Sequence, residues 1–533
     1  MMELKRISIT TILTFVIVSV MSTFIFAETM PDKNISIPNE SNIEKLLTIN
    51  IGNGDQEVAY SPQIEGIAND GPSSFAVGDE GNIYILDTLN KKILVYRNLN
   101  WDSNIDISFC SYPRDIVIKG SSLFILDDSN LIYEVDNKGT IKSIKKLPAK
   151  LEACQINKIS IDNVGNIVAD SGGVKYEIND DGYSKKNEIS LVTKNNGKEI
   201  DIVRGAQVYS TISFIEETGG VNVIKEDAHG NMFVEVIDEV PDSPLVLLES
   251  TVRMIDNSGK QIGFARIPIE DYSNYPLRFF NVTNNDELYI MALKRDSVEI
   301  DKIVLGKKYA SKMSELKVKA KEEKEKLNKI VIESLLGSDP GIPTRSEIKA
   351  RADAMVNLSW TYTAANRSNP NSTNVTMPPY LSSITTFPSY QTKIPYCWGG
   401  FDGVDRSSST SWTNFNDAIS KSKFAGNTNT NTSGWQSGTT GLDCSGFVSA
   451  AILSTTKHNT TYFATAGTAT STPLSMDYYV KSGSHILFYT GAQDTTTIKS
   501  EEATTSGSPQ ATKNYTRTKT WLSTNGYILR TLW

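Results

Sequence analysis

The 533-residue sequence is poor in the residues that build metal sites and disulfide frameworks. It has three histidines and four cysteines, and neither C-x-x-C nor H-x-x-x-H spacing occurs. The common zinc-site patterns are therefore missing, and four cysteines are too few for a disulfide scaffold at this length. Cys110 and Cys154 could pair with each other or stay as two buried thiols. We expect no metal, no cofactor and a fold that rests on ordinary apolar cores.

Dense Lys/Arg stretches with interleaved aromatic residues are also missing, and the formal net charge is −8. Nucleic-acid binding is therefore not expected. Residues 12–26 form an apolar run that follows Lys5 and Arg6 and ends at Ala27. This run is shorter than a comfortable membrane span and ends at a small residue suited to signal-peptidase cleavage. We interpret residues 1–27 as a signal peptide, with an uncleaved anchor as the alternative. The prediction is a secreted or cell-wall-associated protein without a membrane span after cleavage.

Residues 41–306 repeat one pattern, in which an apolar strand, a polar turn and a second strand follow one another. The copies are residues 79–87, 119–127, 163–170, 228–236 and, more weakly, 285–292. An all-strand repeat of roughly forty residues is typical of propeller blades built as antiparallel meanders. We expect an all-β propeller of about six blades, with the missing blade near residues 191–217. A β-sandwich pair or a β-solenoid is the alternative.

The sequences of these copies resemble NHL-type β-propeller repeats. Such an architecture binds more often than it catalyses, so we assign residues 41–306 to recognition of a protein or glycan ligand, by analogy with the architecture. Residues 307–343 then change to Lys, Glu, Ala and Leu and predict a helical linker, more consistent with a solvated spacer than with a dimer seam. At Thr344, the capping-box spacing to Glu347 predicts a new helix and the start of a C-terminal domain, residues 344–533.

One cysteine in this last domain lies in a distinctive context. Residues 441–448 read G-L-D-C-S-G-F-V, and the apolar residues from Phe447 onward recur at helical spacing. Cys444 is therefore expected at a helix N-terminus, where the helix dipole favours a reactive thiolate. Taken alone, a free cysteine is more often buried and inert. The interpretation depends on what accompanies it.

Two further segments accompany it. Residues 395–400 read P-Y-C-W-G-G, and residues 480–491 read V-K-S-G-S-H-I-L-F-Y-T-G, a strand that carries His485. Three such motifs in this order resemble the NlpC-type cell-wall cysteine peptidases of the papain-like superfamily, over residues 344–533. The resemblance implies an α+β papain-like domain in which the cysteine leads a helix that packs on a β-sheet.

The resemblance also implies roles for single residues. Cys444 would be the nucleophile and His485 its base, and Glu502 would orient the histidine, with Glu501 as the fallback. The substrate-binding residues implied by the resemblance are Tyr396, Asp443 and Ser445, the last two for the amino end of the substrate. The substrates would be peptidoglycan stem peptides, cleaved at an amide or isopeptide bond.

Residues 401–440 depart from the family, because this insertion of low-complexity Ser, Thr, Asn and Gly is far longer than the usual link. It could reshape the cleft and so affects any statement about the substrate. The sequence as a whole predicts a multidomain chain with a propeller, a helical linker and a papain-like domain. A secreted cysteine hydrolase is the leading hypothesis. A thiol-dependent acyltransferase or amidase on another substrate is one alternative, and a non-enzymatic cell-surface binding protein with a vestigial catalytic domain is another.

Overall fold

The protein is described by a computed structural model. The described residues are 37–60, 70–147, 156, 158–162, 164–171, 174–179, 182–186, 189–216, 219–227, 229–241, 243, 245–329, 342–368, 370 and 373–533. The proposed signal peptide, residues 1–27, and Cys154 lie outside these ranges. The predictions made for them therefore stay predictions.

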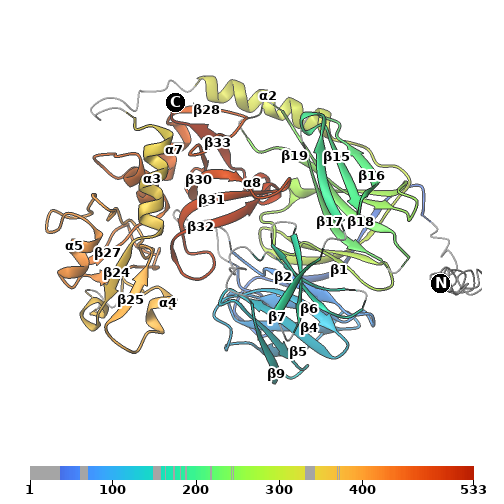
Figure 1. Ribbon diagram of the computed structural model, residues 1–533, viewed down its shortest axis with the longest axis horizontal. Coiled ribbons are helices and arrows are strands. Elements are labelled where there is room, and N and C mark those ends of the chain that lie inside the picture. Colours follow the sequence, from blue (N-terminus) through green and yellow to red (C-terminus); the bar gives the residue numbers. More distant parts are fainter. Residues whose placement is uncertain are drawn as a thin grey trace, which may run out of the picture.

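The first half of the chain consists of six antiparallel sheets (Figure 1). The first sheet contains β2 (Ser74–Val77), β3 (Ile83–Asp87), β4 (Lys92–Arg97) and β5 (Asn100–Asp106). The second contains β6 (Pro113–Lys119), β7 (Ser122–Asp127), β8 (Leu131–Val135) and β9 (Ile141–Lys146). The third sheet contains β10 (Lys158–Ile161), β11 (Ile167–Ser171), β12 (Val174–Asn179) and β13 (Gly182–Lys186). The fourth contains β14 (Ile189–Lys194), β15 (Glu199–Arg204) and β16 (Gln207–Ser213). The fifth sheet contains β17 (Gly219–Glu226), β18 (Met232–Glu239), β19 (Leu248–Ile255) and β20 (Gln261–Ile267). The sixth contains β21 (Phe280–Val282), β22 (Leu288–Leu293) and β23 (Ser297–Val304), together with β1 (Asn42–Asn50).

These sheets have the connectivity of a β-propeller. The N-terminal strand β1 pairs antiparallel with β23 and so completes the last sheet. Apolar side chains join the sixth sheet to the first, the first to the second, the second to the third, the fourth to the fifth and the fifth to the sixth. The described residues form no such cluster between the third and fourth sheets. The predicted series of meanders is confirmed, and the missing blade is the three-stranded sheet β14–β16.

The linker helix α2 (Met313–Lys329) differs from the expected solvated spacer. Met313 and Ala320 are buried against Val240 and Leu247 of the propeller. The narrow apolar stripe on the helix therefore has a partner within the same chain, the apolar residues Val240 and Leu247 in the connection between β18 and β19. None of the helices in the described ranges combines the length and apolar composition needed to cross a bilayer.

The C-terminal half contains a six-stranded antiparallel sheet in the order β28-β33-β29-β30-β31-β32. Its strands are β28 (Thr468–Ala469), β29 (Tyr478–Lys481), β30 (His485–Ala492), β31 (Thr497–Thr504), β32 (Ala511–Thr518) and β33 (Ile528–Thr531). Its helices are α3 (Arg345–Val356), α4 (Pro379–Ser382), α5 (Phe415–Ser420), α6 (Cys444–Ala451), α7 (Thr460–Thr465) and α8 (Lys519–Thr524). Two short strand pairs complete it, β24 (Ser359–Tyr362) with β25 (Ser389–Thr392), and β26 (Phe424–Ala425) with β27 (Thr439–Thr440). Short 3-10 turns lie at Asn195–Gly197, Ile269–Asp271 and Ala364–Arg367.

The two faces of this sheet have different neighbours. Helices α3 and α6 pack on the face that carries Phe488 and Ala503. The other face, with Leu487 and Ile498, shares a core with α8 and with the fifth and sixth sheets of the propeller. Figure 1 shows the C-terminal sheet in red between α3 and the propeller. The alternation of side chains along each strand thus divides the sheet between two partners.

Helix α3 begins as its sequence predicts. The Thr344 hydroxyl accepts the backbone N–H of Glu347, and the Glu347 carboxylate accepts the backbone N–H of Thr344 at 2.7 Å. This reciprocal capping box satisfies donors that a helix start otherwise leaves unpaired. It places the first helix of the C-terminal half at its predicted residue.

Candidate functional site

Cys444 is the first residue of helix α6, and Asp443 caps the helix. The Asp443 side chain accepts the backbone N–H of Gly446 at 2.7 Å. Gly446 is required by close packing, because a Cβ there would lie 2.0 Å from the carbonyl oxygen of Gly400. The D-C-S-G sequence therefore starts the helix against the glycine-rich loop at residues 399–400. It leaves the thiol in the first turn, at the positive end of the helix dipole.

His485 and Glu502 lie on the neighbouring strands β30 and β31 and are in direct contact. Nε2 of His485 is 2.7 Å from Oε2 of Glu502, and both side chains are fully buried. Helix α6 packs on both strands, and the ring of Phe447 meets the ring of Phe488 edge-on, with 6.0 Å between centroids. The structure therefore joins His485 to Glu502 on the face of the sheet that carries Leu487 and Ile498. The helix that begins at Cys444 packs on the opposite face, with Phe488 and Ala503.

Glu501, the alternative to Glu502, points to the other side of the sheet. Its carboxylate pairs with Lys349 of α3 at 2.9 Å. Burial raises the pKa of Glu501 to about 7. Since neighbouring residues on a strand face opposite sides, only one of these two glutamates can meet His485. In the structure that residue is Glu502.

Electrostatic interactions also connect Cys444 to this pair. The phenol of Tyr527 is buried, which raises its pKa, and Glu502 and Cys444 both raise it further. Asp443, next to the thiol, acts in the same direction on the pKa of His485. Charges influence a pKa in this way only at short range. The charges of Cys444, Asp443, His485 and Glu502 thus act on common neighbours, and direct contact between the Cys444 sulfur and the His485 imidazole stays a prediction.

The His485 ring is suited to act as a base. Its Nε2–H donates to the Glu502 carboxylate, so the lone pair lies on Nδ1. Nδ1 is buried and has no hydrogen-bond partner among the described residues. Burial lowers the pKa of His485, and the Glu502 hydrogen bond and charge oppose this effect. A neutral imidazole with a free, buried acceptor nitrogen can take up a proton from a nearby donor.

Arg517 on β32 is part of the site and was missed by sequence reasoning. Its Nη2 donates to Oε2 of Glu502 at 2.7 Å, and its Nε donates to Oε1 at 3.2 Å. The guanidinium also stacks on the rings of Tyr515 and Trp521. Burial alone would raise the pKa of Glu502, but Arg517 and His485 outweigh it and hold that pKa well below its usual range. Glu502 is thus a permanent anion at neutral pH.

Asp443 and Ser445, expected to meet the substrate, are engaged within the protein. Asp443 Oδ2 accepts the backbone N–H of Gly399 at 2.9 Å and pairs with the Lys457 ammonium at 3.0 Å. Lys457 also donates to the Ser445 hydroxyl at 3.0 Å. A lysine of the chain therefore already occupies the place where these two residues would hold an ammonium group. Sequence spacing contains no signal for Lys457.

Tyr396 and Cys397 lie beside the loop that leads into α6. Tyr396 is fully buried and forms a parallel bridge with Leu442, two residues before the thiol. The Cys397 thiol donates to the Thr439 hydroxyl at 3.3 Å, and burial raises its pKa. Cys397 is thus a packing residue within hydrogen-bonding reach of the 401–440 insertion.

The 401–440 insertion is folded onto the same loop. Asp402 is buried and accepts the indole N–H of Trp412 at 3.0 Å and the backbone N–H of Gly441 at 3.4 Å. The indole N–H of Trp398 reaches the carbonyl oxygen of Thr432 at 3.1 Å. The insertion is therefore part of the wall of the candidate site, as far as the described residues show. These residues contain no group of three His, Cys, Asp or Glu side chains that could hold a metal ion.

Comparisons with known proteins concern the fold alone. No family model matches the sequence, and no curated protein matches it. Similar solved structures include virginiamycin B lyase from Staphylococcus aureus, at 14% identity, TM-score 0.32, over 50% of this chain and 100% of that one. BamB from Moraxella catarrhalis matches at 9% identity and TM-score 0.24, over 49% and 97% of the two chains. The WD40 β-propeller domain of Doa1 matches at 11% and 0.27, over 49% and 97%. All three are propellers, and at these scores nothing about ligands follows.

Proposed function

We propose that the C-terminal half is an NlpC-type, papain-like cysteine hydrolase that cleaves amide or isopeptide bonds in peptidoglycan stem peptides outside the cell. The observation that carries the proposal is the buried His485–Glu502 pair on the two strands against which the Cys444 helix packs. A helix-terminal thiol and an oriented, neutral imidazole are the two groups that nucleophilic thiol catalysis requires, and the proposal is that they meet during the reaction.

The residues divide the chemistry between them. Nδ1 of His485 takes the Cys444 proton, and the thiolate attacks the substrate carbonyl carbon, with the oxyanion held at the start of α6. The imidazolium then donates its proton to the leaving amine, and the C–N bond breaks. Water attacks the resulting thioester, with His485 again as the base. Glu502 stabilises the imidazolium, and Arg517 keeps Glu502 charged and in place.

The test is digestion of peptidoglycan fragments by the purified mature protein, with products identified by mass spectrometry. We expect new stem-peptide fragments from the wild type and none from Cys444→Ala. Cys397→Ala is the matched control, because Cys397 is equally buried and packs nearby. Identical products from wild type and Cys444→Ala would sink the catalytic assignment.

Acyl transfer to an amine is the second candidate, and burial of the site favours it. Cys444 and His485 are both 0% exposed, so bulk water reaches the thiol only if a neighbouring segment moves. A site that excludes water lets an amine acceptor compete for the thioester. Adding glycinamide to the digestion separates the two: amide products in preference to acids indicate transfer, and acids alone indicate hydrolysis.

Lys457 gives the proposed site a specificity that departs from the family. Its ammonium neutralises Asp443 and contacts Ser445, where the resemblance implies that the amino end of the substrate binds. We expect substrates whose corresponding end is uncharged, since a second ammonium would meet like charge. Lys457→Met should raise kcat/KM about tenfold for peptides with a free amino end relative to their acetylated forms. An unchanged preference would exclude this role for Lys457.

The propeller is assigned to binding and positioning, and we propose that it is of the NHL type. It packs directly on the hydrolase sheet, with the Thr495 hydroxyl bonded to Val221 and Lys519 paired with Glu239 at 2.8 Å. The propeller and the sheet therefore share a boundary.

A further inference from the structure

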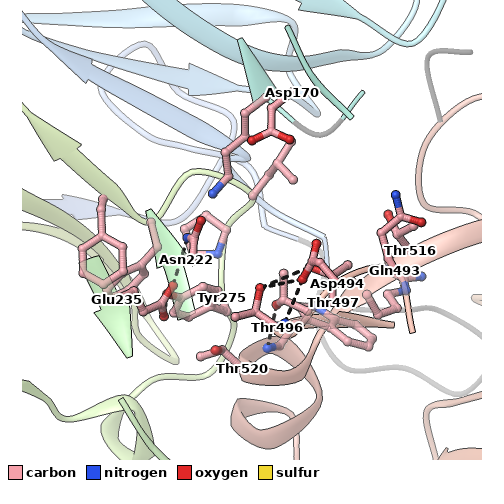
Figure 2. A pocket seen from close by; sticks show the side chains of 18 of the residues that line it. Asp170, Asn222, Glu235, Tyr275, Gln493, Asp494, Thr496, Thr497, Thr516 and Thr520 are labelled. Carbon is pink, nitrogen blue, oxygen red and sulfur yellow. Dashed lines mark hydrogen bonds between the residues drawn. The ribbon is translucent and has the colours of Figure 1, made fainter. Parts of the chain in front are cut away.

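A cavity of about 520 Å³ lies on this boundary. Its walls come from several strands of the propeller, among them β10 to β14, and from the segment that joins β30 to β31, together with β32 and α8. Figure 2 shows Asp494, Thr496 and Thr497 close to Tyr275 and Thr520, with Asp170 at a separate part of the wall. The third and fourth sheets, which share no apolar cluster among the described residues, both line it. The volume suits one small organic ligand.

Cations outnumber acids in this wall. Among the described residues, six Lys or Arg side chains line the cavity against four Asp or Glu side chains. Three of the four acids are engaged: Asp70 accepts the Tyr112 hydroxyl at 2.6 Å, Glu235 accepts the Tyr275 hydroxyl at 2.9 Å, and Asp494 accepts the backbone N–H of Thr496 at 2.8 Å. Three of the six cations are ion-paired as well, Arg114 with Asp128, Lys186 with Asp162 and Arg517 with Glu502, which leaves Lys158, Lys175 and Lys185.

Three of the cations are lysines without partners. Lys158, Lys175 and Lys185 form no hydrogen bond or ion pair with any described residue. Lys158 and Lys175 both stand opposite Asp170 in the pairing of β10, β11 and β12, whereas Lys185 stands opposite Tyr176 on the other face of that sheet. Burial lowers the pKa of Lys158 and the neighbouring Arg278 lowers it further, while the carboxylates of Glu235, Asp170 and Asp115 oppose this effect in part. An anion among these ammonium groups would relieve the repulsion.

The rest of the wall suits an organic body. The aromatic side chains of Tyr275, Phe279 and Trp521 add apolar lining, and the threonines from 495 to 497 add polar lining. Aromatic faces and a few polar groups around a charged anchor are typical of small-molecule sites. The guanidinium of Arg517, which holds Glu502, also lines this cavity.

We propose that this cavity binds a small organic anion with carboxylate or phosphate groups, held by Lys158, Lys175 and Lys185. Binding of this anion also affects the candidate active site, because Arg517 belongs both to the cavity wall and to the ion pair with Glu502. An anion that attracts Arg517 weakens its hold on Glu502 and so changes the basicity of His485. This second effect rests on the proposed function, whereas the binding does not.

The test is calorimetric titration of the full-length mature protein at low ionic strength. The carboxylate probe is acetyl-triglutamate, with acetyl-triglutamine as its neutral control, and the phosphate probe is glucose 6-phosphate, with glucose as its control. We expect at least one anionic probe to bind ten times or more tightly than its control. Lys158→Met, or Lys175→Gln with Lys185→Gln, should weaken that binding about tenfold, and Lys138→Gln, an exposed lysine outside the cavity, should not. Unchanged melting temperatures confirm that each variant is folded.

The two probes distinguish the source of the anion. Tighter binding of triglutamate indicates an acidic peptide, and tighter binding of the sugar phosphate indicates a phosphorylated metabolite. The proposal is overturned if neither anion binds better than its control, or if binding is the same in the lysine variants. Loss of hydrolysis in Cys444→Ala with intact anion binding would separate the cavity from the catalytic assignment.

Discussion

Two of the buried arginine–carboxylate pairs, one in the propeller and one in the C-terminal part, differ in what else the carboxylate touches. In the propeller, Arg278 donates two hydrogen bonds to Asp115, at 2.8 and 2.5 Å. In the C-terminal half, Arg517 donates two to Glu502. The chemistry of the pair is the same. The other groups that contact the carboxylate decide whether the ion pair has only a structural role.

The groups that hydrogen-bond to Asp115 do not exchange protons near neutral pH. Its carboxylate also accepts the Ser74 hydroxyl at 2.6 Å and the backbone N–H of Ile159 at 2.8 Å, so it ties the first three sheets together. Burial would raise the pKa of Asp115, but Arg278 overrides this and lowers it. Glu502, in contrast, meets a histidine with an unoccupied nitrogen. The comparison teaches that an ion pair becomes part of a reactive site when its second partner can exchange a proton.

The largest effect is expected in the propeller. Arg278→Met removes one member of a closed buried pair and leaves Asp115 as an uncompensated charge. The free energy of unfolding should fall by about 3–5 kcal/mol. Urea denaturation followed by circular dichroism measures this loss. Adding Asp115→Asn should recover part of it, and a loss below about 1 kcal/mol would contradict the account.

A smaller loss is expected for Arg517→Met. Glu502 then keeps His485, which can take up a proton and compensate the charge, so the free energy of unfolding should fall by about 1–3 kcal/mol. The loss should shrink as the pH is lowered toward 5, because His485 becomes charged more easily. The same denaturation series over pH checks this. Equal losses in the two arginine variants would remove the distinction between the two pairs.

The smallest effect is a shift in the titration of His485. Burial lowers its pKa below the usual 6.5, so the folded protein binds this proton less readily than the unfolded chain. The contribution of neutral His485 to the free energy of unfolding is therefore complete above pH 6.5 and is lost as the pH falls below that value. Arg517→Met removes a cation that lowers this pKa and should move the titration upward. Nuclear magnetic resonance of the imidazole nitrogens measures both, and a wild-type midpoint above 6.5 would contradict the assignment.

The repeat in the sequence predicted most of the propeller strands, but it did not predict which strands close the propeller. The repeats at 79–87 and 119–127 became the second strands of their sheets, because an apolar strand after a tight turn is a local signal. The pairing of Asn42–Asn50 with Ser297–Val304 joins the ends of the repeat region, and no local pattern encodes that. The apolar stripe of α2 was likewise visible, but its partner on the fifth sheet was not.

The candidate site shows the same limit. Strand alternation separates Glu502 from Glu501, so the choice between them could be made from the sequence once the family pattern was stated. Arg517 lies 15 residues from Glu502, and Lys457 lies 12 residues from Ser445. Whether such residues meet depends on the length of a hairpin and the path of a loop. Those contacts are properties of the fold.

The measurement that tests the central claim most directly is the rate of alkylation of each cysteine by iodoacetamide at pH 7, followed by peptide mass spectrometry. Cys444 and Cys397 are both 0% exposed and Cys110 is 1% exposed, so burial is matched and a rate difference reports thiolate character. We predict that Cys444 reacts at least a hundredfold faster than the other two, and that His485→Ala abolishes the difference. Equal rates for Cys444 and Cys397, or an unchanged Cys444 rate in His485→Ala, would contradict the account and favour a binding protein with a vestigial site.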